Sequence, residues 1–89
     1  MDFMEWCEII DLTITSRLGA RFVEQTRSSP DEWGWRYGTN TAAIVLQRPS
    51  GTDAKVLING KEQSTFSLLE KPQWIGETIA GWLAGTVAS

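Results

Sequence analysis

The sequence predicts an α+β fold with an N-terminal helix, an antiparallel meander of four to five short strands, and a C-terminal helix. Apolar residues recur at helical spacing near both ends of the chain, and the middle alternates between apolar and polar residues. Asn59 and Gly60 form the strongest hairpin signal in the chain. A length of 89 residues suits one modest core, so residues 1–89 are expected to form a single domain.

The N-terminal segment predicts an amphipathic helix. Asp2 can cap it, Glu5 completes a capping box, and Gly19 stands where the helix should end. A strand remains the alternative for residues 9–15, where polar and apolar residues alternate and β-branched side chains are frequent. The apolar helix face comprises Phe3, Trp6, Cys7, Ile10, Ile14 and Leu18.

Four strand-like runs precede Asn59, and another follows Gly60. Loops are expected at residues 27–31 and 48–53, where small and polar residues gather. The expected strands before the hairpin turn are residues 20–26, 33–37, 41–47 and 54–58.

The register of the hairpin at Asn59 and Gly60 has two solutions. A plain two-residue turn puts Phe66 and Val56 on opposite faces of the sheet. A three-residue loop with Gly60 as a bulge pairs Val56 with Ser64 and puts Phe66 on the face of Val56. Because burial of a single apolar face fixes register, we favour the bulged loop, with Gly60 in a left-handed conformation.

Residues from Pro72 onward predict the second helix. Pro72 suits the first turn, where its missing N–H costs nothing. Gly76 and Gly81 each cost roughly 1 kcal/mol against alanine inside a helix, which indicates close contact with a neighbouring backbone. The apolar residues at helical spacing are Trp74, Ile75, Ile79, Trp82 and Leu83.

The composition argues against catalysis and metal binding. The chain has no histidine, the commonest general base and metal ligand, so histidine-dependent triads and zinc sites of cysteine and histidine are excluded within one chain. No phosphate-binding or dinucleotide-binding glycine motif follows a strand. The single cysteine, Cys7, is expected to be buried and inert. We therefore expect no enzyme activity, no cofactor and no metal.

Charge and hydropathy favour a cytoplasmic protein. The net charge is −3 and the basic residues are scattered, which argues against nucleic acid as a partner. The N-terminus is acidic where a signal peptide would be basic, and the longest apolar stretch is too short to span a membrane. A lone cysteine fits a reducing compartment.

Trp33, Trp35 and Tyr37 line one side of their expected strand, while Arg36 points to the other side. The aromatic row can be core beneath the helices, a protein contact, or a platform that stacks bases or sugars. Of these three interpretations we favour the core.

The apolar content of the central strands predicts self-association. Two helices cover one face of a small sheet, which leaves Val45 and Leu57 on the other face. An exposed apolar patch of this kind marks an interface. A monomer with its helices on opposite faces of the sheet is the alternative.

Together these features predict a non-catalytic protein-interaction module, an adaptor, inhibitor or small chaperone-like binder that forms a homodimer. One alternative is a nucleic-acid-associated protein that uses the aromatic strand with Arg27, Arg36 and Arg48; another is a ligand binder whose pocket forms between subunits. The expected contact residues are Trp33, Trp35, Tyr37, Arg36, Val45 and Leu57.

Overall fold

The computed structural model describes residues 2–47 and 51–85, which form two helices, one 3₁₀ turn and five strands. In chain order these are α1 (Phe3–Leu18), η1 (Ala20–Phe22), β1 (Val23–Ser28), β2 (Glu32–Tyr37), β3 (Asn40–Leu46), β4 (Asp53–Ile58), β5 (Lys61–Ser67) and α2 (Pro72–Leu83).

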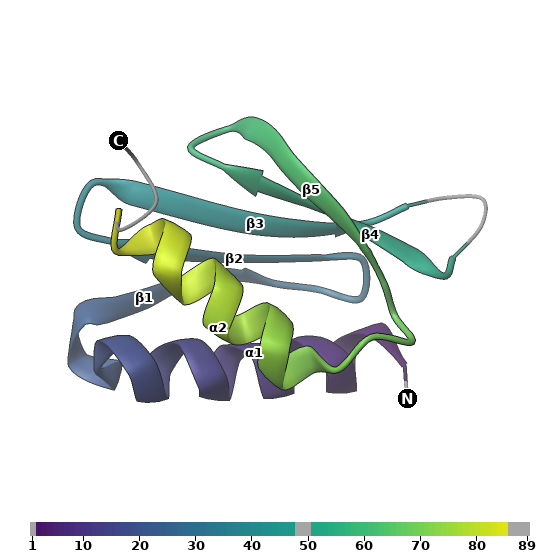
Figure 1. Ribbon diagram of the computed structural model, residues 1–89, viewed down its shortest axis with the longest axis horizontal. Coiled ribbons are helices and arrows are strands. Elements are labelled where there is room, and N and C mark those ends of the chain that lie inside the picture. Colours follow the sequence, from purple (N-terminus) through teal and green to yellow (C-terminus); the bar gives the residue numbers. More distant parts are fainter. Residues whose placement is uncertain (1, 48–50, 86–89) are drawn as a thin grey trace.

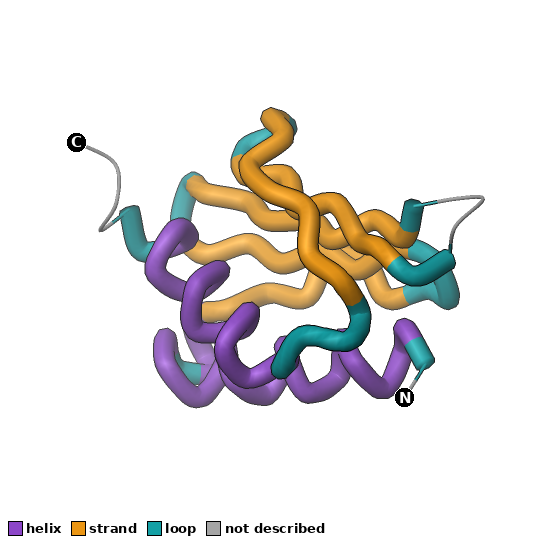
Figure 2. Tube along the Cα trace, turned by 45° about the vertical axis from the view of Figure 1, so that its right-hand side comes forward, coloured by secondary structure: helices purple, strands orange, loops and turns teal. Residues whose placement is uncertain are grey.

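The strands form one antiparallel meander in the order β1-β2-β3-β4-β5. Both helices lie on the same side of this sheet and pack against each other (Figures 1 and 2). The predicted α+β architecture is therefore confirmed. The alternative with helices on opposite faces is wrong, so one face of the sheet has no helix over it.

Helix α1 begins with the predicted capping box. The Glu5 N–H donates to Asp2 Oδ1 at 2.9 Å, and the Asp2 N–H donates to Glu5 Oε1 at 3.3 Å. The strand alternative for residues 9–15 is wrong. The hydroxyls of Thr13 and Thr15 donate to carbonyls one turn earlier, at 2.9 and 3.0 Å, so these β-branched residues satisfy their polar groups inside the helix.

The first strand differs most from the sequence prediction, while β2, β3 and β4 differ from their expected bounds by one residue. After Gly19, at φ 93°, residues 20–22 form a 3₁₀ turn instead of a strand, and the Phe22 side chain is exposed. Strand β1 instead extends to Ser28, inside the predicted loop. The left-handed Gly19 redirects the chain out of α1, and a tight turn brings it back to the sheet edge.

The hairpin between β4 and β5 combines the two predicted registers. Asn59 and Gly60 have φ values of 53° and 83°, as a two-residue turn with a left-handed Gly60 requires. The favoured three-residue loop is therefore wrong. Val56 nevertheless pairs with Ser64, because the extra residue is a bulge at Gln63 within β5. The bulge restores the buried face that the prediction required.

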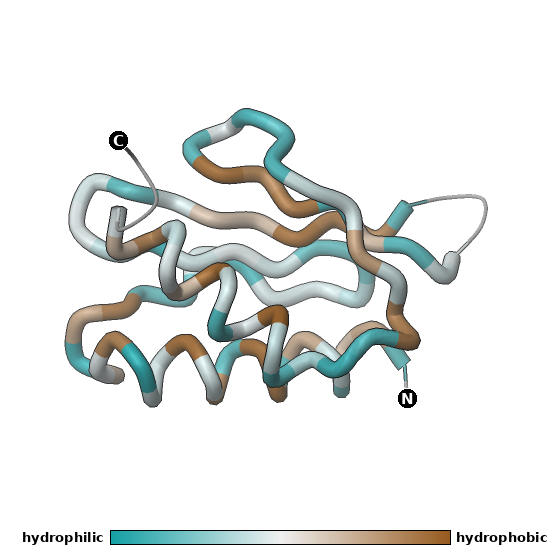
Figure 3. The backbone as a smooth tube through the Cα atoms, in the orientation of Figure 1, coloured by the Kyte–Doolittle hydropathy of each residue, from teal (hydrophilic) through white to brown (hydrophobic). Residues whose placement is uncertain are grey.

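The core lies between the helix pair and the sheet. Trp6, Cys7 and Trp35 are fully buried there, as expected for Cys7. Strand β2 is mostly pale in Figure 3, because a hydropathy scale ranks tryptophan near neutral although its large side chain is well suited to a core. The other buried apolar residues include Ile10, Ile14, Ile44, Val56, Ile75, Ile79 and Leu83.

Four side-chain hydrogen bonds tie the helices to the rest of the fold, and the longest runs from Gln25 Nε2 of β1 to Asp11 Oδ1 at 3.3 Å. Trp35 Nε1 donates to Asp11 Oδ1 of α1 at 2.7 Å. Asn40 Nδ2 donates to the carbonyl of Leu83 near the end of α2 at 2.8 Å. Trp6 Nε1 donates to the carbonyl of Glu70 at 3.1 Å. Within residues 2–47 and 51–85, no helix is both long enough and apolar enough to cross a bilayer.

Candidate functional site: the open face of the sheet

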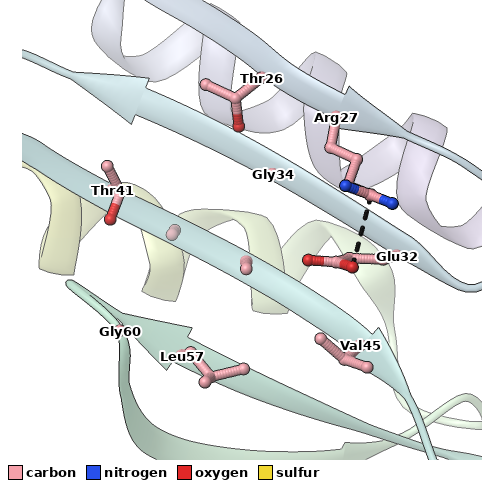
Figure 4. Close-up of a pocket in the computed structure, with 10 residues that line it drawn as sticks. Thr26, Arg27, Glu32, Gly34, Thr41, Val45, Leu57 and Gly60 are labelled. Carbon is pink, nitrogen blue, oxygen red and sulfur yellow. Dashed lines mark ion pairs between the residues drawn. The ribbon is translucent and has the colours of Figure 1, made fainter.

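The side of the sheet without helices, here called the open face, is the candidate site. Because side chains alternate along a strand, residues next to the buried ones point to this face. At its centre, Gly34 of β2 pairs with Ala43 of β3, which pairs with Leu57 of β4; Val45 lies beside them. Figure 4 shows this side, with the helices behind the strands.

The centre of the open face is hollowed. The hollow has a volume of about 430 Å³ and includes Gly34, Ala43, Val45 and Leu57 in its lining. Gly34 contributes no side chain. A Cβ at this position would lie 2.6 Å from Oγ1 of Thr26, a residue of the neighbouring strand β1. Small residues therefore form the floor, while the half-buried side chains of Val45 and Leu57 stand beside it.

Three ion pairs surround this centre, and they are all the ion pairs found among the described residues. Arg27 Nε lies 3.4 Å from Glu32 Oε1, and Lys55 Nζ lies 2.9 Å from Glu62 Oε2. Arg36 pairs with Glu24 across β1 and β2. Alternation from the buried residues places all six side chains on the open face, so acids and bases balance around the apolar centre.

The expected contact residues divide between the two sides of the sheet. Trp33 and Trp35 are only 4% and 0% exposed beneath the helices, which corrects their assignment to a contact surface and leaves no ring free to stack a base. Tyr37 is half-buried on the same side. The open face carries Arg36, Val45 and Leu57, but Arg36 pairs with Thr41 and lies toward the opposite end of β2 from Val45, outside the lining of the hollow.

The sequence alone does not reveal the residues that shape this face. Nothing in the sequence marks Gly34 and Ala43 as the floor of a hollow, because the hollow exists only where β2 and β3 pair. The ion pairs were also missed, since the partners are 5 to 12 positions apart on different strands or flanking a loop. The register of β1 with β2 and that of β4 with β5 are needed to place these partners together.

The two edges of the sheet are less suited to pairing than its face. Strand β1 contains a bulge at Thr26, and β5 contains one at Gln63. Bulges disturb the row of free backbone groups that another strand would need. A partner would therefore meet the side chains of the open face more readily than the backbone of an edge.

Other chemistry is sparse in the part of the chain that the structure describes. No group of three or more histidine, cysteine, aspartate or glutamate side chains there is placed to hold a metal ion. Burial raises the pKa of the Cys7 thiol far above its usual value, so this side chain is a poor nucleophile. In comparisons with known proteins, no family model, curated protein or solved structure matches this chain.

Proposed function

We propose that the protein is a non-catalytic interaction module that forms a homodimer through the open face. The single observation that carries this proposal is the hollow bordered by apolar side chains on the one sheet face that no helix covers. Exposed apolar surface that is framed by polar groups is typical of interaction sites.

Shape favours a second copy as the partner. The face carries both a hollow, floored by Gly34 and Ala43, and a half-buried apolar side chain, Leu57, at its border. A two-fold axis would place Leu57 of each copy over the hollow of the other, so that the same contact is made twice.

Charge favours the same arrangement. The whole chain has a net charge of −3, but the three ion pairs contribute equal numbers of acids and bases to the face. Two copies that meet through this face therefore avoid the repulsion between their acidic surfaces, and rotation can bring acids of one copy near bases of the other.

The size of the face predicts a weak dimer. Five strands spaced about 4.8 Å apart and about six residues long cover roughly 20 by 20 Å, or on the order of 400 Å² in projection. A standard interface buries about 800 Å² per partner, so a dissociation constant in the micromolar range is expected.

Sedimentation of the purified chain tests the proposal. Between about 1 and 500 μM, the mass should rise from 9.9 kDa toward twice that value. Leu57→Asp should keep the protein monomeric over this range, because it places a charge where the interface must be dry. Leu69→Asp is the matched control, since Leu69 is 94% exposed in the loop before α2. Monomeric wild-type protein throughout, or equal dimerisation of both variants, would refute the proposal.

Ala43→Leu separates shape from simple hydrophobicity. The longer side chain fills the hollow while making the face more apolar, so the geometry predicts weaker association. Stronger association would show that two copies do not meet by inserting Leu57 into this hollow.

The proposal extends to cellular context. We propose a cytoplasmic module, acting as an adaptor, inhibitor or small chaperone-like binder, and two features support it. The chain lacks the histidine that most acid–base sites use, and its one thiol is buried within the fold.

A further inference from the structure

A second hollow lies between α1 and the edge strand β1, on the helix side of the sheet. Its volume is about 500 Å³. Gln25 and Ser28 of β1 line it, and they pair with Trp35 and Trp33, so their side chains lie on the helix side of the sheet and not on the open face. A ligand here would not compete with a second copy on the open face. The hollow is lined by Met4, Glu8, Asp11, Leu12, Gln25, Ser28 and Trp33.

One stripe of α1 forms its helical wall. Met4, Glu8 and Leu12 are spaced four residues apart and therefore lie one above another on the helix. The side chains of Met4 and Leu12 are 40% and 67% exposed, which is unusual for large apolar residues in this fold. An acid between two exposed apolar side chains suits a ligand that has an aliphatic stem and a cationic head.

The charges of the hollow are all of one sign. Glu8 and Asp11 supply them, and no basic residue is in the lining. Among the described residues the Glu8 side chain forms no hydrogen bond or ion pair, and the Asp11 carboxylate accepts only from the neutral donors Trp35 and Gln25. A cation from outside the chain would complement these carboxylates.

Trp33 adds a second, independent feature. It is 4% exposed, and its Nε1–H has no acceptor among residues 2–47 and 51–85. A buried donor without an acceptor is costly, and native proteins rarely retain one without a reason. A carbonyl oxygen is the commonest acceptor that a protein partner offers.

We propose that this hollow binds a basic peptide, with an arginine or lysine side chain between Met4 and Leu12 and its cationic head at Glu8; a peptide carbonyl accepts from Trp33 once the indole N–H, which is closed off from solvent in the free chain, turns toward the hollow. A peptide is the ligand class that supplies the cation, the aliphatic stem and the carbonyl together. The site is separate from the open face, so the proposal stands whether or not the chain dimerises.

Nuclear magnetic resonance of the ¹⁵N-labelled full chain tests the site directly. The probe is the capped tripeptide acetyl-Ala-Arg-Ala-amide, and acetyl-Ala-Glu-Ala-amide is its matched control. The Trp33 indole signal is assigned by its loss in Trp33→Phe. The arginine peptide should shift this signal, together with the backbone signals of residues 4–12 and 25–28, in a saturable manner, and the glutamate peptide should not.

Two charge-neutralising variants then locate the cation. Glu8→Gln should weaken binding of the arginine peptide about fivefold, as expected for loss of one exposed ion pair. Glu77→Gln removes another exposed glutamate, on α2, and should leave the affinity unchanged. Equal shifts with both peptides, an unmoved Trp33 indole signal, or equal affinities for the two variants would overturn the proposal.

Discussion

Replacement of Gly76 by alanine tests how closely the two helices pack. A Cβ at this position would lie 2.6 Å from Cβ of Thr13, 2.9 Å from its Cγ2, and 3.1 Å from the carbonyl oxygen of Ile10. None of these atoms is the far end of a flexible side chain, so α1 and α2 must move apart to admit the methyl group.

The expected effect is the difference between two opposing terms. Alanine gains about 1 kcal/mol over glycine in a helix interior. Overpacking of a tight contact costs roughly 1–3 kcal/mol, and the contact at 2.6 Å places Gly76 at the severe end. Gly76→Ala should therefore lower the free energy of unfolding by about 1–2 kcal/mol, and the melting temperature by roughly 5–10 °C.

Urea unfolding followed by tryptophan fluorescence measures this change, and Thr13→Gly supplies the partner variant. Because Thr13→Gly removes the Cβ that Gly76→Ala would strike, the double variant should be less destabilised than the two single variants together. If Gly76→Ala instead stabilises the protein by about 1 kcal/mol, helix propensity alone governs this position and the close contact is refuted.

Further variants test the turn, the thiol and the buried indole. Gly60→Val should cost about 1–2 kcal/mol in urea unfolding, because φ of 83° strains a β-branched residue; an unchanged midpoint would contradict it. Cys7 should react with a thiol reagent only after unfolding, since burial raises its pKa, and rapid labelling of native protein would disprove its placement. Asp11→Ala should cost about 1.5–3 kcal/mol, because Trp35 Nε1 loses a charged acceptor at 2.7 Å; calorimetry measures it, and Asp11→Asn should recover part of the loss. Trp35→Asp should unfold the chain as judged by circular dichroism, because this side chain is fully buried; a folded monomer would show otherwise.

The helices and the middle strands could be predicted from local chemistry. The capping box at Asp2 and Glu5, the proline at position 72 and the left-handed Gly60 depend on neighbouring residues only, and each appears as expected. The strand β2 was also predictable, because aromatic residues alternate along it. Residues 20–22 were not, since a three-residue segment such as Ala-Arg-Phe is compatible with a 3₁₀ turn as well as with a strand.

The candidate sites are formed by contacts between distant segments, which the local sequence pattern does not reveal. Val45 and Leu57 were expected on the uncovered face; alternation alone places them on one face, and the packing of both helices on the other side leaves that face uncovered. The side taken by Trp33 and Trp35 could not be settled in the same way, because a row of aromatic residues has the same spacing whether a helix or a partner covers it. Packing of α1 over β2, with the bond from Trp35 to Asp11, put these tryptophans in the core.

The sequence by itself determined which segments are helix and strand, which residues share a face, and that residues in the core would be apolar, because periodicity and capping are properties of neighbours along the chain. Tertiary structure alone decided that both helices cover one side of the sheet, that Gly34 and Ala43 meet at the floor of a hollow, and that Glu8 and Trp33 line a second hollow together. These features arise from pairings between distant segments, where register and packing select one arrangement from several that the local pattern permits.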